Sequence, residues 1–251
     1  MRLAPINSWV ATVGKVAQAA LDGLLPHLCL FCDQPTHNGA AICDCCVQAL
    51  EPNDAGCPRC ALPRTGGSLC AECQSIAQQP ERAPLAQITA PWVYDVYLSH
   101  LMQRWKYGKE RRLQSAAAYL MLSACPCLDR YDLVLATPLH WQRHFSRGFN
   151  QSEDLLNAIA RRTPRLQSLR ATSPRLLRRQ RTGKQALGSR RERLRNMRAA
   201  FEVRGDAGGR RVLIVDDICT TGATATAMAQ ALTAAGASRV SLWCMARTPR
   251  R

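Results

Sequence analysis

Two adjacent carboxylates precede a turn of small hydroxyl residues in the stretch VLIVDDICTTGAT, residues 212–224. Asp216 and Asp217 can accept hydrogen bonds from the paired hydroxyls of a sugar, but they would repel a phosphate placed directly against them. The small residues that follow allow the backbone to close around a phosphate, and their hydroxyls can donate to it. We therefore expect a sugar phosphate, with its diol on the aspartates and its phosphate in the turn made by Thr220, Thr221, Gly222, Ala223 and Thr224.

The elements on either side of this turn would place it at the edge of a sheet. Residues 212–215 are all apolar, as in a buried strand of a parallel sheet, and residues 224–235 form an Ala-rich helix whose first amides face the turn. Open α/β sheets bind ligands at the carboxyl ends of their strands. This strand has neither the GxxxxGK(S/T) loop of nucleoside triphosphate sites nor the GxGxxG of dinucleotide sites. The simpler alternative is an ordinary strand, turn and helix whose aspartates only cap the turn.

The same stretch resembles the phosphoribosyl pyrophosphate (PRPP) signature of type I phosphoribosyltransferases, a hydrophobic strand followed by an acidic pair, two variable residues and Thr-Thr-Gly-x-Thr. The resemblance implies that the ribose hydroxyls lie on Asp216 and Asp217 and that the 5′-phosphate lies in the turn. For an enzyme it implies displacement of pyrophosphate at the anomeric carbon, with Mg²⁺ on the pyrophosphate and the two aspartates as catalytic residues. No residue stands out as a general base for the acceptor, which the sequence does not identify.

A second strand, loop and helix unit precedes the first. Residues 132–137 predict a buried strand that ends at Pro138, and residues 151–162 have helical periodicity. Two such units bring two loops to one edge of a sheet, and a PRPP site needs one loop for the ribose phosphate and one for the pyrophosphate. In the earlier loop we expect the pyrophosphate to be bound by backbone amides in the stretch from Thr137 through Pro138 to Leu139 and by the side chains of Arg143 and Arg147. Trp141 and Phe149 flank these arginines and are candidates either for stacking on a base or for ordinary packing.

The remaining pattern completes an α/β domain with an open, mostly parallel sheet. Strands are expected over residues 92–96 and 238–246, and helices over 98–107, 111–124 and 185–197. The stretch from Arg178 to Gln185 has no apolar side chain and predicts an exposed mobile loop that can close over a ligand.

Nine of the thirteen cysteines fall within residues 29–73, eight of them in four CxxC pairs. A CxxC turn presents two thiolates at the spacing of a tetrahedral metal, and two such turns complete a structural zinc site. The simplest pairing is two successive ribbons, although an interleaved pairing and a single zinc ion stay open: Cys29, Cys32, Cys43 and Cys46, then Cys57, Cys60, Cys70 and Cys73. Cys45 is the extra member of this group, and Cys125, Cys127, Cys219 and Cys244 are expected to pack as small hydrophobic residues.

Two alternatives to zinc are a disulfide framework and a redox protein that uses its CxxC pairs. A disulfide framework needs an oxidising compartment. The apolar stretch 9–25 is interrupted by Lys15 and Asp22 and is not followed by a small-residue cleavage site, so neither export nor stable membrane insertion is indicated. We expect a cytoplasmic protein whose residues 1–26 form an amphipathic helical segment.

The net charge of +16 is unevenly distributed. Residues 161–198 contain fourteen basic side chains and one acidic one, Glu192, and nearly all of the basic ones are arginine. Arginine suits bidentate phosphate contacts and stacks on bases. This segment therefore predicts binding to nucleic acid or to a polyphosphorylated ligand, with a merely solvated surface as the alternative. The candidate contact residues are Arg178, Arg179, Arg181, Lys184, Arg190 and Arg193.

Over most of residues 29–248 the chain resembles the ComF family and, within it, the GntX proteins. The shared features are the double CxxC ribbon, the segments WKYGK (105–109) and RGFNQ (147–151), the positions Gln185, Arg193 and Asn196, and VDDICTTGAT. The resemblance implies a zinc ribbon followed by a type I phosphoribosyltransferase domain, handling of incoming single-stranded DNA, and DNA-uptake or recombination proteins as partners.

The domain boundaries expected from these features are an N-terminal segment over 1–26, a double zinc ribbon over 27–75, a linker over 76–91 and a phosphoribosyltransferase-like domain over 92–251. Two functions follow. One is a PRPP-dependent transferase whose acceptor is a nucleotide or nucleic acid. The other is a non-catalytic DNA-binding accessory protein with a regulatory PRPP site, since a shared fold does not establish the reaction.

Overall fold

The chain divides into two compact units, Met1–Ala49 and Leu50–Arg251, in the computed structural model. The smaller unit holds the first Cys-rich module with helix α2 (Asp44–Gln48), and the larger holds the second module with helix α3 (Ala71–Ala77) together with the sheet. The structure describes residues 27–36, 41–78, 84–108, 110, 112–139, 149–171, 175–178 and 200–250.

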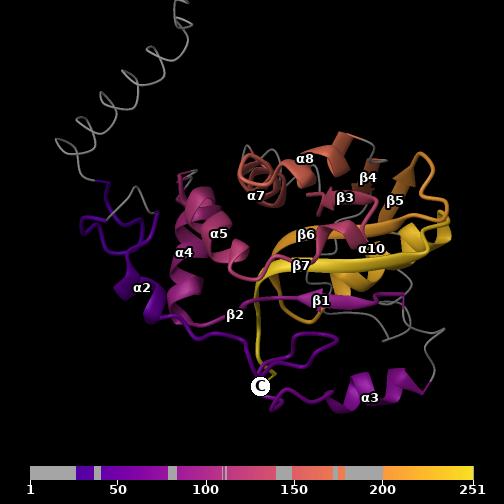
Figure 1. The fold of residues 1–251 in the computed structure, drawn as a ribbon, viewed down its shortest axis with the longest axis horizontal. Coiled ribbons are helices and arrows are strands. Elements are labelled where there is room, and N and C mark those ends of the chain that lie inside the picture. The colour runs from indigo at the N-terminus through magenta and orange to yellow at the C-terminus, as the bar shows by residue number, and fades with distance from the viewer. Residues whose placement is uncertain are drawn as a thin grey trace, which may run out of the picture. The chain divides into compact units, whose positions relative to one another are not determined.

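A parallel sheet forms the centre of the larger unit (Figure 1). Its order is β1-β7-β6-β3, and β2 also pairs with β7. The register sets Ala136 of β3 opposite Val215 of β6, so the carboxyl ends of these two strands meet at one edge, as the sequence predicts. The strands are β1 (Gln87–Thr89), β2 (Trp92–Val93), β3 (Leu133–Ala136), β6 (Arg211–Cys219) and β7 (Arg239–Arg247).

Both faces of this sheet are buried, which explains why its strands are apolar runs instead of alternating ones. On β6, Val212 and Ile214 belong to a core that includes Met228 of helix α10 (Ala223–Ala234). Leu213 and Val215 point to the opposite face and are equally buried. That face is contacted by α5 (Leu113–Leu122) and α7 (Gln151–Ala160).

The predicted helices and strands are present where the structure describes them, with shifted ends. Helix α4 (Val96–Tyr107) begins earlier than predicted because Asp95 caps it by accepting from the amide of Leu98, at 2.8 Å. The strand expected over 92–96 is therefore cut to β2. Strand β6 instead continues past its apolar residues, because it keeps pairing with β7 as far as Cys219. The helix expected over 185–197 and the segment 1–26 lie outside the described residues.

Several elements carry no clear sequence pattern. Strand β1 lies within 76–91, the segment expected to be a linker. Its N–H and C=O groups are satisfied on one side by β7, and on the other side the amide of Ile88 donates to the carbonyl of Arg59 in the second Cys-rich module, at 2.8 Å. The other unpredicted elements are the 3₁₀ helix η2 (Leu128–Arg130), helix α8 (Pro164–Ala171), and the antiparallel pair β4 (Arg175–Arg178) and β5 (Phe201–Arg204).

Two sequence expectations are wrong. Arg178 is not in a loop: it ends β4 opposite Phe201, and its guanidinium lies 5.4 Å from the centre of that ring, so pairing and stacking hold it in a strand. Cys125 and Cys127 are exposed between α5 and η2 and do not pack in the core, whereas Cys219 and Cys244 are buried as expected.

None of the helices in the described part of the chain combines the length and the hydropathy that crossing a membrane requires.

Candidate functional site

The acidic pair lies at the carboxyl end of β6, and each aspartate has a different set of partners. Asp216 Oδ1 accepts from the amide of Asp217 at 2.9 Å and from the hydroxyl of Ser152 at 2.8 Å. Asp217 Oδ1 accepts from the amide of Ile218 at 2.6 Å, and its Oδ2 pairs with Lys106 Nζ at 2.6 Å. Both carboxylates are thus held by their own backbone and by side chains from two helices that are distant in sequence.

Ser152 is brought to Asp216 by the start of α7. Asn150 caps this helix by accepting from the amide of Ser152 at 3.2 Å, and its Nδ2 donates to the carbonyl of Thr137 at 3.1 Å. One asparagine thus ties the end of β3 to the start of α7. This gives a structural reason for the asparagine of the RGFNQ segment.

Lys106 comes from α4 and, like Ser152, is a residue of the site that the sequence did not predict. It belongs to the WKYGK segment, whose Trp105 is fully buried and anchors the helix. The Lys106 ammonium compensates the negative charge of Asp217, only 11% of whose side chain is exposed. Its place in a shared segment was the available sequence signal, but periodicity alone does not show that the lysine faces the acidic pair.

The electrostatics of the pair raise the pKa of Asp216 to about 6. Burial is the main cause and the negative charge of Asp217 adds to it, while the hydroxyl of Ser152, the amide of Asp217 and the charge of Lys106 act in the opposite direction. Asp216 is therefore a carboxyl whose pKa lies above that of an exposed aspartate.

The turn after β6 has the geometry that the sequence predicts for a phosphate loop. Gly222 lies in the left-handed region at φ 77°, a conformation that other residues adopt only with strain, and α10 begins at the next residue. The hydroxyl of Thr221 accepts from the amide of Ala223 at 3.3 Å, and Thr220 and Thr221 are exposed. Thr224 lies in the first turn of α10, where amides have no intrahelical partner.

At the end of β3, Thr137 supplies a second group that faces this edge. Its amide donates to the carbonyl of Val215 at 2.9 Å, and the residue is 6% exposed. Among the described residues, the buried Thr137 hydroxyl has no hydrogen-bond partner. Such an oxygen is expected where a ligand or water completes the site.

Part of the predicted site cannot be compared with the structure. Phe149 is described and is buried, which favours packing over base stacking. Pro138 follows Thr137 directly and is partly buried. Arg143, Arg147 and Trp141, and the candidate nucleic-acid residues Arg179, Arg181, Lys184, Arg190 and Arg193, lie outside the described residues.

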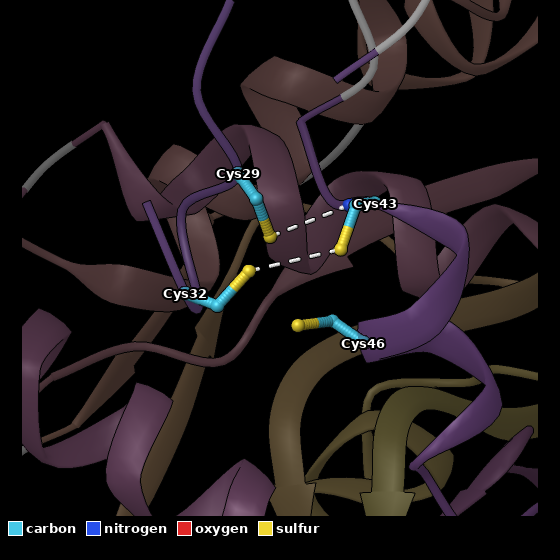
Figure 2. A group of neighbouring side chains, drawn as sticks. All are labelled: Cys29, Cys32, Cys43 and Cys46. Atoms are coloured by element: carbon cyan, nitrogen blue, oxygen red, sulfur yellow. Dashed lines mark hydrogen bonds between the residues drawn. The ribbon is translucent and has the colours of Figure 1, made fainter. Parts of the chain in front are cut away.

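The eight CxxC cysteines form two groups of four, and within each group the sulfur atoms lie within 4.8 Å of one another. The groups are the successive ones, so the interleaved pairing is not the one that forms: Cys29, Cys32, Cys43 and Cys46 in one, and Cys57, Cys60, Cys70 and Cys73 in the other. Figure 2 shows the four sulfurs of the first group pointing toward a common centre.

The sulfur spacing fits a tetrahedral zinc ion. With a Zn–S bond of about 2.3 Å, the edge of a tetrahedron is about 3.8 Å. The Sγ atoms of Cys32 and Cys43 are 3.8 Å apart, and those of Cys60 and Cys70 are 3.6 Å apart. A disulfide would need about 2.0 Å, and all of these cysteines are free thiols. The four thiols would supply all four ligands, so such an ion would be structural.

The two modules repeat the same backbone pattern. In the first, the amide of Asp33 donates to the carbonyl of Cys29 at 2.8 Å, and in the second the amide of Ala61 donates to the carbonyl of Cys57 at 2.8 Å. Asp33 and Ala61 both have positive φ, at 57° and 52°. In each module a short helix follows the third cysteine, α2 after Cys43 and α3 after Cys70.

Backbone amides also prepare one thiol in each module for metal binding. Burial alone would raise the pKa of Cys29, but hydrogen bonds from the amides of Cys43, Cys32 and Phe31 lower that pKa to about 7. Cys57 has the corresponding set of amide donors and likewise a pKa of about 7. A lowered thiol pKa favours the thiolate that binds zinc.

Comparison with known proteins supports both halves of this description. A double zinc ribbon domain family matches residues 20–74, and a phosphoribosyl transferase domain family matches residues 175–251. DNA utilization protein YhgH from Escherichia coli O6:H1 is 33% identical over 231 residues, which cover 89% of this chain and 98% of the relative. Competence protein ComFC from Streptococcus pneumoniae is 24% identical over 212 residues, covering 84% and 90% of the two chains.

Among solved structures, UMP synthase from Leishmania donovani is 18% identical and covers 57% of this chain and 22% of its own, with a TM-score of 0.28. That TM-score is too low to support an argument.

The fold and the two cysteine clusters define a protein with a double zinc ribbon and a phosphoribosyltransferase-type domain. The chain belongs to the ComF family, which includes the DNA utilization protein YhgH.

The cysteine geometry predicts two zinc ions per chain. Cys46→Ser should reduce the zinc content to one ion, because it removes a ligand from the first cluster. Cys45→Ser is the matched control, since Cys45 is exposed and outside both clusters. Metal analysis of the purified proteins measures both. A wild-type chain without zinc would show that the CxxC pairs serve another purpose.

The raised pKa of Asp216 predicts that Asp216→Asn stabilises the folded protein near neutral pH. The unfolded carboxyl has a pKa of 3.8 and the folded one about 6, so the energetic cost of its charge is absent at low pH, grows between these values and is complete above them. The gain in the free energy of unfolding should be roughly 1–3 kcal/mol near neutral pH and should vanish near pH 4. Urea unfolding across this pH range measures it.

Asp132→Asn is the control of opposite sign. Hydrogen bonds from the Arg211 guanidinium lower the pKa of Asp132 to about 2, so its charge stabilises the fold above its unfolded pKa of 3.8 and loses that effect as the pH falls toward 2. Its substitution should therefore destabilise the protein near neutral pH. If both variants shifted stability in the same direction, the assigned environments would be wrong.

Proposed function

We propose that this chain binds PRPP at the carboxyl edge of its sheet and takes part in the handling of single-stranded DNA in the cytoplasm. The observation that carries the first part is the acidic pair at the end of β6, followed by a turn with a left-handed glycine and the start of α10. Carboxylates and helix amides at one strand end suit a ligand with both hydroxyls and a phosphate.

In the proposed complex, the ribose hydroxyls donate to Asp216 and Asp217 and the 5′-phosphate accepts from the turn of residues 220–224. Lys106 pairs with Asp217 Oδ2 at 2.6 Å and compensates the charge of this largely buried side chain. The Thr137 hydroxyl, which lacks a described partner, is available for the pyrophosphate. Arg143 and Arg147 are proposed to neutralise that group from the same loop.

For catalysis, the fold favours positioning and electrostatic stabilisation over acid–base chemistry. Loss of pyrophosphate from the anomeric carbon leaves positive charge on the sugar, and two carboxylates next to the ribose can stabilise it. Mg²⁺ bound with PRPP would supply further charge compensation on the pyrophosphate. The acceptor is proposed to be a nucleotide or nucleic acid.

The DNA part of the proposal rests on charge and on the names of the relatives. The relatives carry the names DNA utilization protein YhgH and Competence protein ComFC, and residues 161–198 contain fourteen basic side chains against one acidic one. In its described part, Arg161 and Arg175 are exposed, whereas Arg170 bonds Glu153 at 2.6 Å and is used within the fold. DNA-uptake or recombination proteins are the proposed partners.

PRPP binding provides the first test. Asp217→Asn should weaken the affinity for PRPP with Mg²⁺ by about tenfold or more, because the carboxylate loses its charge as an acceptor of the ribose hydroxyls. Lys106→Met should weaken it as well, because Asp217 then loses its counter-charge. Isothermal titration calorimetry measures both. Asp206→Asn is the control, since Asp206 is an exposed carboxylate on the turn before β6. An unchanged affinity in both site variants would exclude the assigned site.

Whether PRPP is consumed or only bound distinguishes a transferase from a protein that senses PRPP. Release of pyrophosphate in the presence of a base or nucleotide, lost in Asp216→Ala/Asp217→Ala, would show an enzyme. Binding of PRPP without turnover, combined with a change in DNA affinity, would favour the accessory protein with a regulatory site. The latter is the second candidate because a shared fold does not establish the reaction.

Single-stranded DNA binding should weaken steeply with salt, because counterions are released from each neutralised phosphate. Replacing Arg179, Arg181 and Lys184 by glutamine should lower the magnitude of the slope of log K against log salt by about 2, at about 0.7 for each phosphate contact. Fluorescence anisotropy with a labelled oligonucleotide measures it. Arg239→Gln is the control, since Arg239 is exposed at the opposite, amino-terminal edge of the sheet. Salt-independent binding would remove the DNA part of the proposal.

A further inference from the structure

Arg247 is a buried arginine that joins the second Cys-rich module to the end of β6. It is the last residue of β7 and is only 5% exposed. Its Nε donates to the carbonyl of Cys60 at 3.2 Å, and its Nη1 donates to the carbonyl of Cys219 at 3.0 Å. One guanidinium therefore spans two segments that are far apart in sequence.

This arginine has no carboxylate to balance it in the part of the chain that the structure describes. Burying a cation is unfavourable unless its donors find acceptors, and here two backbone carbonyls accept from two of its N–H groups. Bonds from a charged donor are shorter and stronger than neutral ones, and the planar guanidinium keeps the two carbonyls in a fixed relation. Arg247 is therefore suited to setting geometry.

Each of the two carbonyls lies at a functional position. Cys60 is a member of the second cysteine cluster, and Ala61 after it has the left-handed φ that closes the CxxC turn. Cys219 is the last residue of β6, directly before the proposed phosphate turn, and its carbonyl also accepts from the amide of Thr248 at 3.0 Å. The bond to Cys219 thus fixes where the turn begins.

The second module is anchored to the sheet on the same side. Asn53 Nδ2 donates to the carbonyls of Ala61 and Ala90, at 2.8 and 3.1 Å, and Ala61 is part of the main core together with Ile88 of β1. The second module is therefore attached to the sheet through Asn53 and Ala61. If the module needs zinc to fold, loss of zinc would disturb its hydrogen bonds to Ile88 of β1 and to Arg247.

Between the module and the turn, packing is incomplete. A cavity of about 200 Å³ is lined by Cys60, Ile88, Gly222, Thr226 and Arg247, among others. The hydrogen bonds of Arg247 join the module to the start of the turn beside this space.

We propose that Arg247 is a positioning residue that transmits the zinc-dependent fold of the second module to the turn of residues 220–224. The second cluster then serves the PRPP site as well as its own stability. The expected effect on PRPP affinity rests on the proposed function, whereas the expected effect on the structural stability of the turn does not.

Hydrogen exchange in Arg247→Met tests the link without any ligand. Amides of residues 219–226 should exchange about tenfold faster than in the wild type, because the anchor at the Cys219 carbonyl is lost. Amides of residues 212–215 should keep their protection and the chain should keep two zinc ions, which separates a local effect from general unfolding. Arg247→Lys should show an intermediate increase, since an ammonium keeps the charge but not the fork that spans both carbonyls.

Arg250→Met is the matched control. Arg250 also bonds the second module, through Glu72, but it is exposed and does not reach the Cys219 carbonyl. It should leave the exchange of the turn unchanged. Normal exchange of the turn in a folded, zinc-loaded Arg247→Met would overturn the proposal, as would an equal increase in Arg250→Met.

PRPP titration of the same variants separates the two claims. If the wild type binds PRPP, Arg247→Met should bind it about tenfold more weakly. If the wild type does not bind PRPP but the turn still exchanges faster in Arg247→Met, the proposed function fails and the coupling of module and turn stands.

Discussion

Two adjacent negative charges at the end of a buried strand are the constraint around which the larger unit is organised. Asp216 and Asp217 would repel each other and lose hydration if they had no partners. Helix α7 supplies the Ser152 hydroxyl to one, and helix α4 supplies the Lys106 ammonium to the other. The compensation is incomplete, because the pKa of Asp216 stays raised. A carboxyl with a raised pKa is common at sites where a bound ligand supplies further hydrogen-bond donors.

The same constraint explains why both helices need firm anchors. Trp105 is fully buried next to Lys106, and Asn150 joins the start of α7 to the end of β3. A small shift of either helix would move a partner away from the acidic pair. The buried tryptophan and the capping asparagine thus serve the site through position and do not require contact with a ligand.

The two cysteine modules show how one local design can have two structural roles. Their backbone hydrogen bonds and left-handed residues correspond position by position. The first lies in the unit Met1–Ala49, whereas the second contributes Ala61 to the main core of the larger unit and bonds the edge strand β1. An uncovered edge strand invites pairing with other chains, so the second module also protects the sheet. The arginines also have two kinds of role. Arg247 and Arg211 make hydrogen bonds within the fold, whereas Arg161 is exposed.

The sequence alone determined what depends on neighbours along the chain. The apolar run, the acidic pair and the small residues after it were enough to predict β6, the turn and α10, because strand, turn and helix preferences are local. The CxxC spacing likewise predicted metal ligands. Local propensity did not determine the ends of the elements: Asp95 shortened β2 by capping α4, and pairing with β7 extended β6 through polar residues.

Only the tertiary structure decided which distant residues meet. It selected the successive grouping of the cysteines, placed Lys106 and Ser152 on the acidic pair, put Arg178 in a strand against Phe201, and buried Arg247 between two carbonyls. Neither sequence periodicity nor a local motif specifies which partner each of these residues meets, because that depends on the packing of elements that are separated in sequence. The sequence therefore specified the ligands and the turn, and the fold specified the charges and anchors that make them a site.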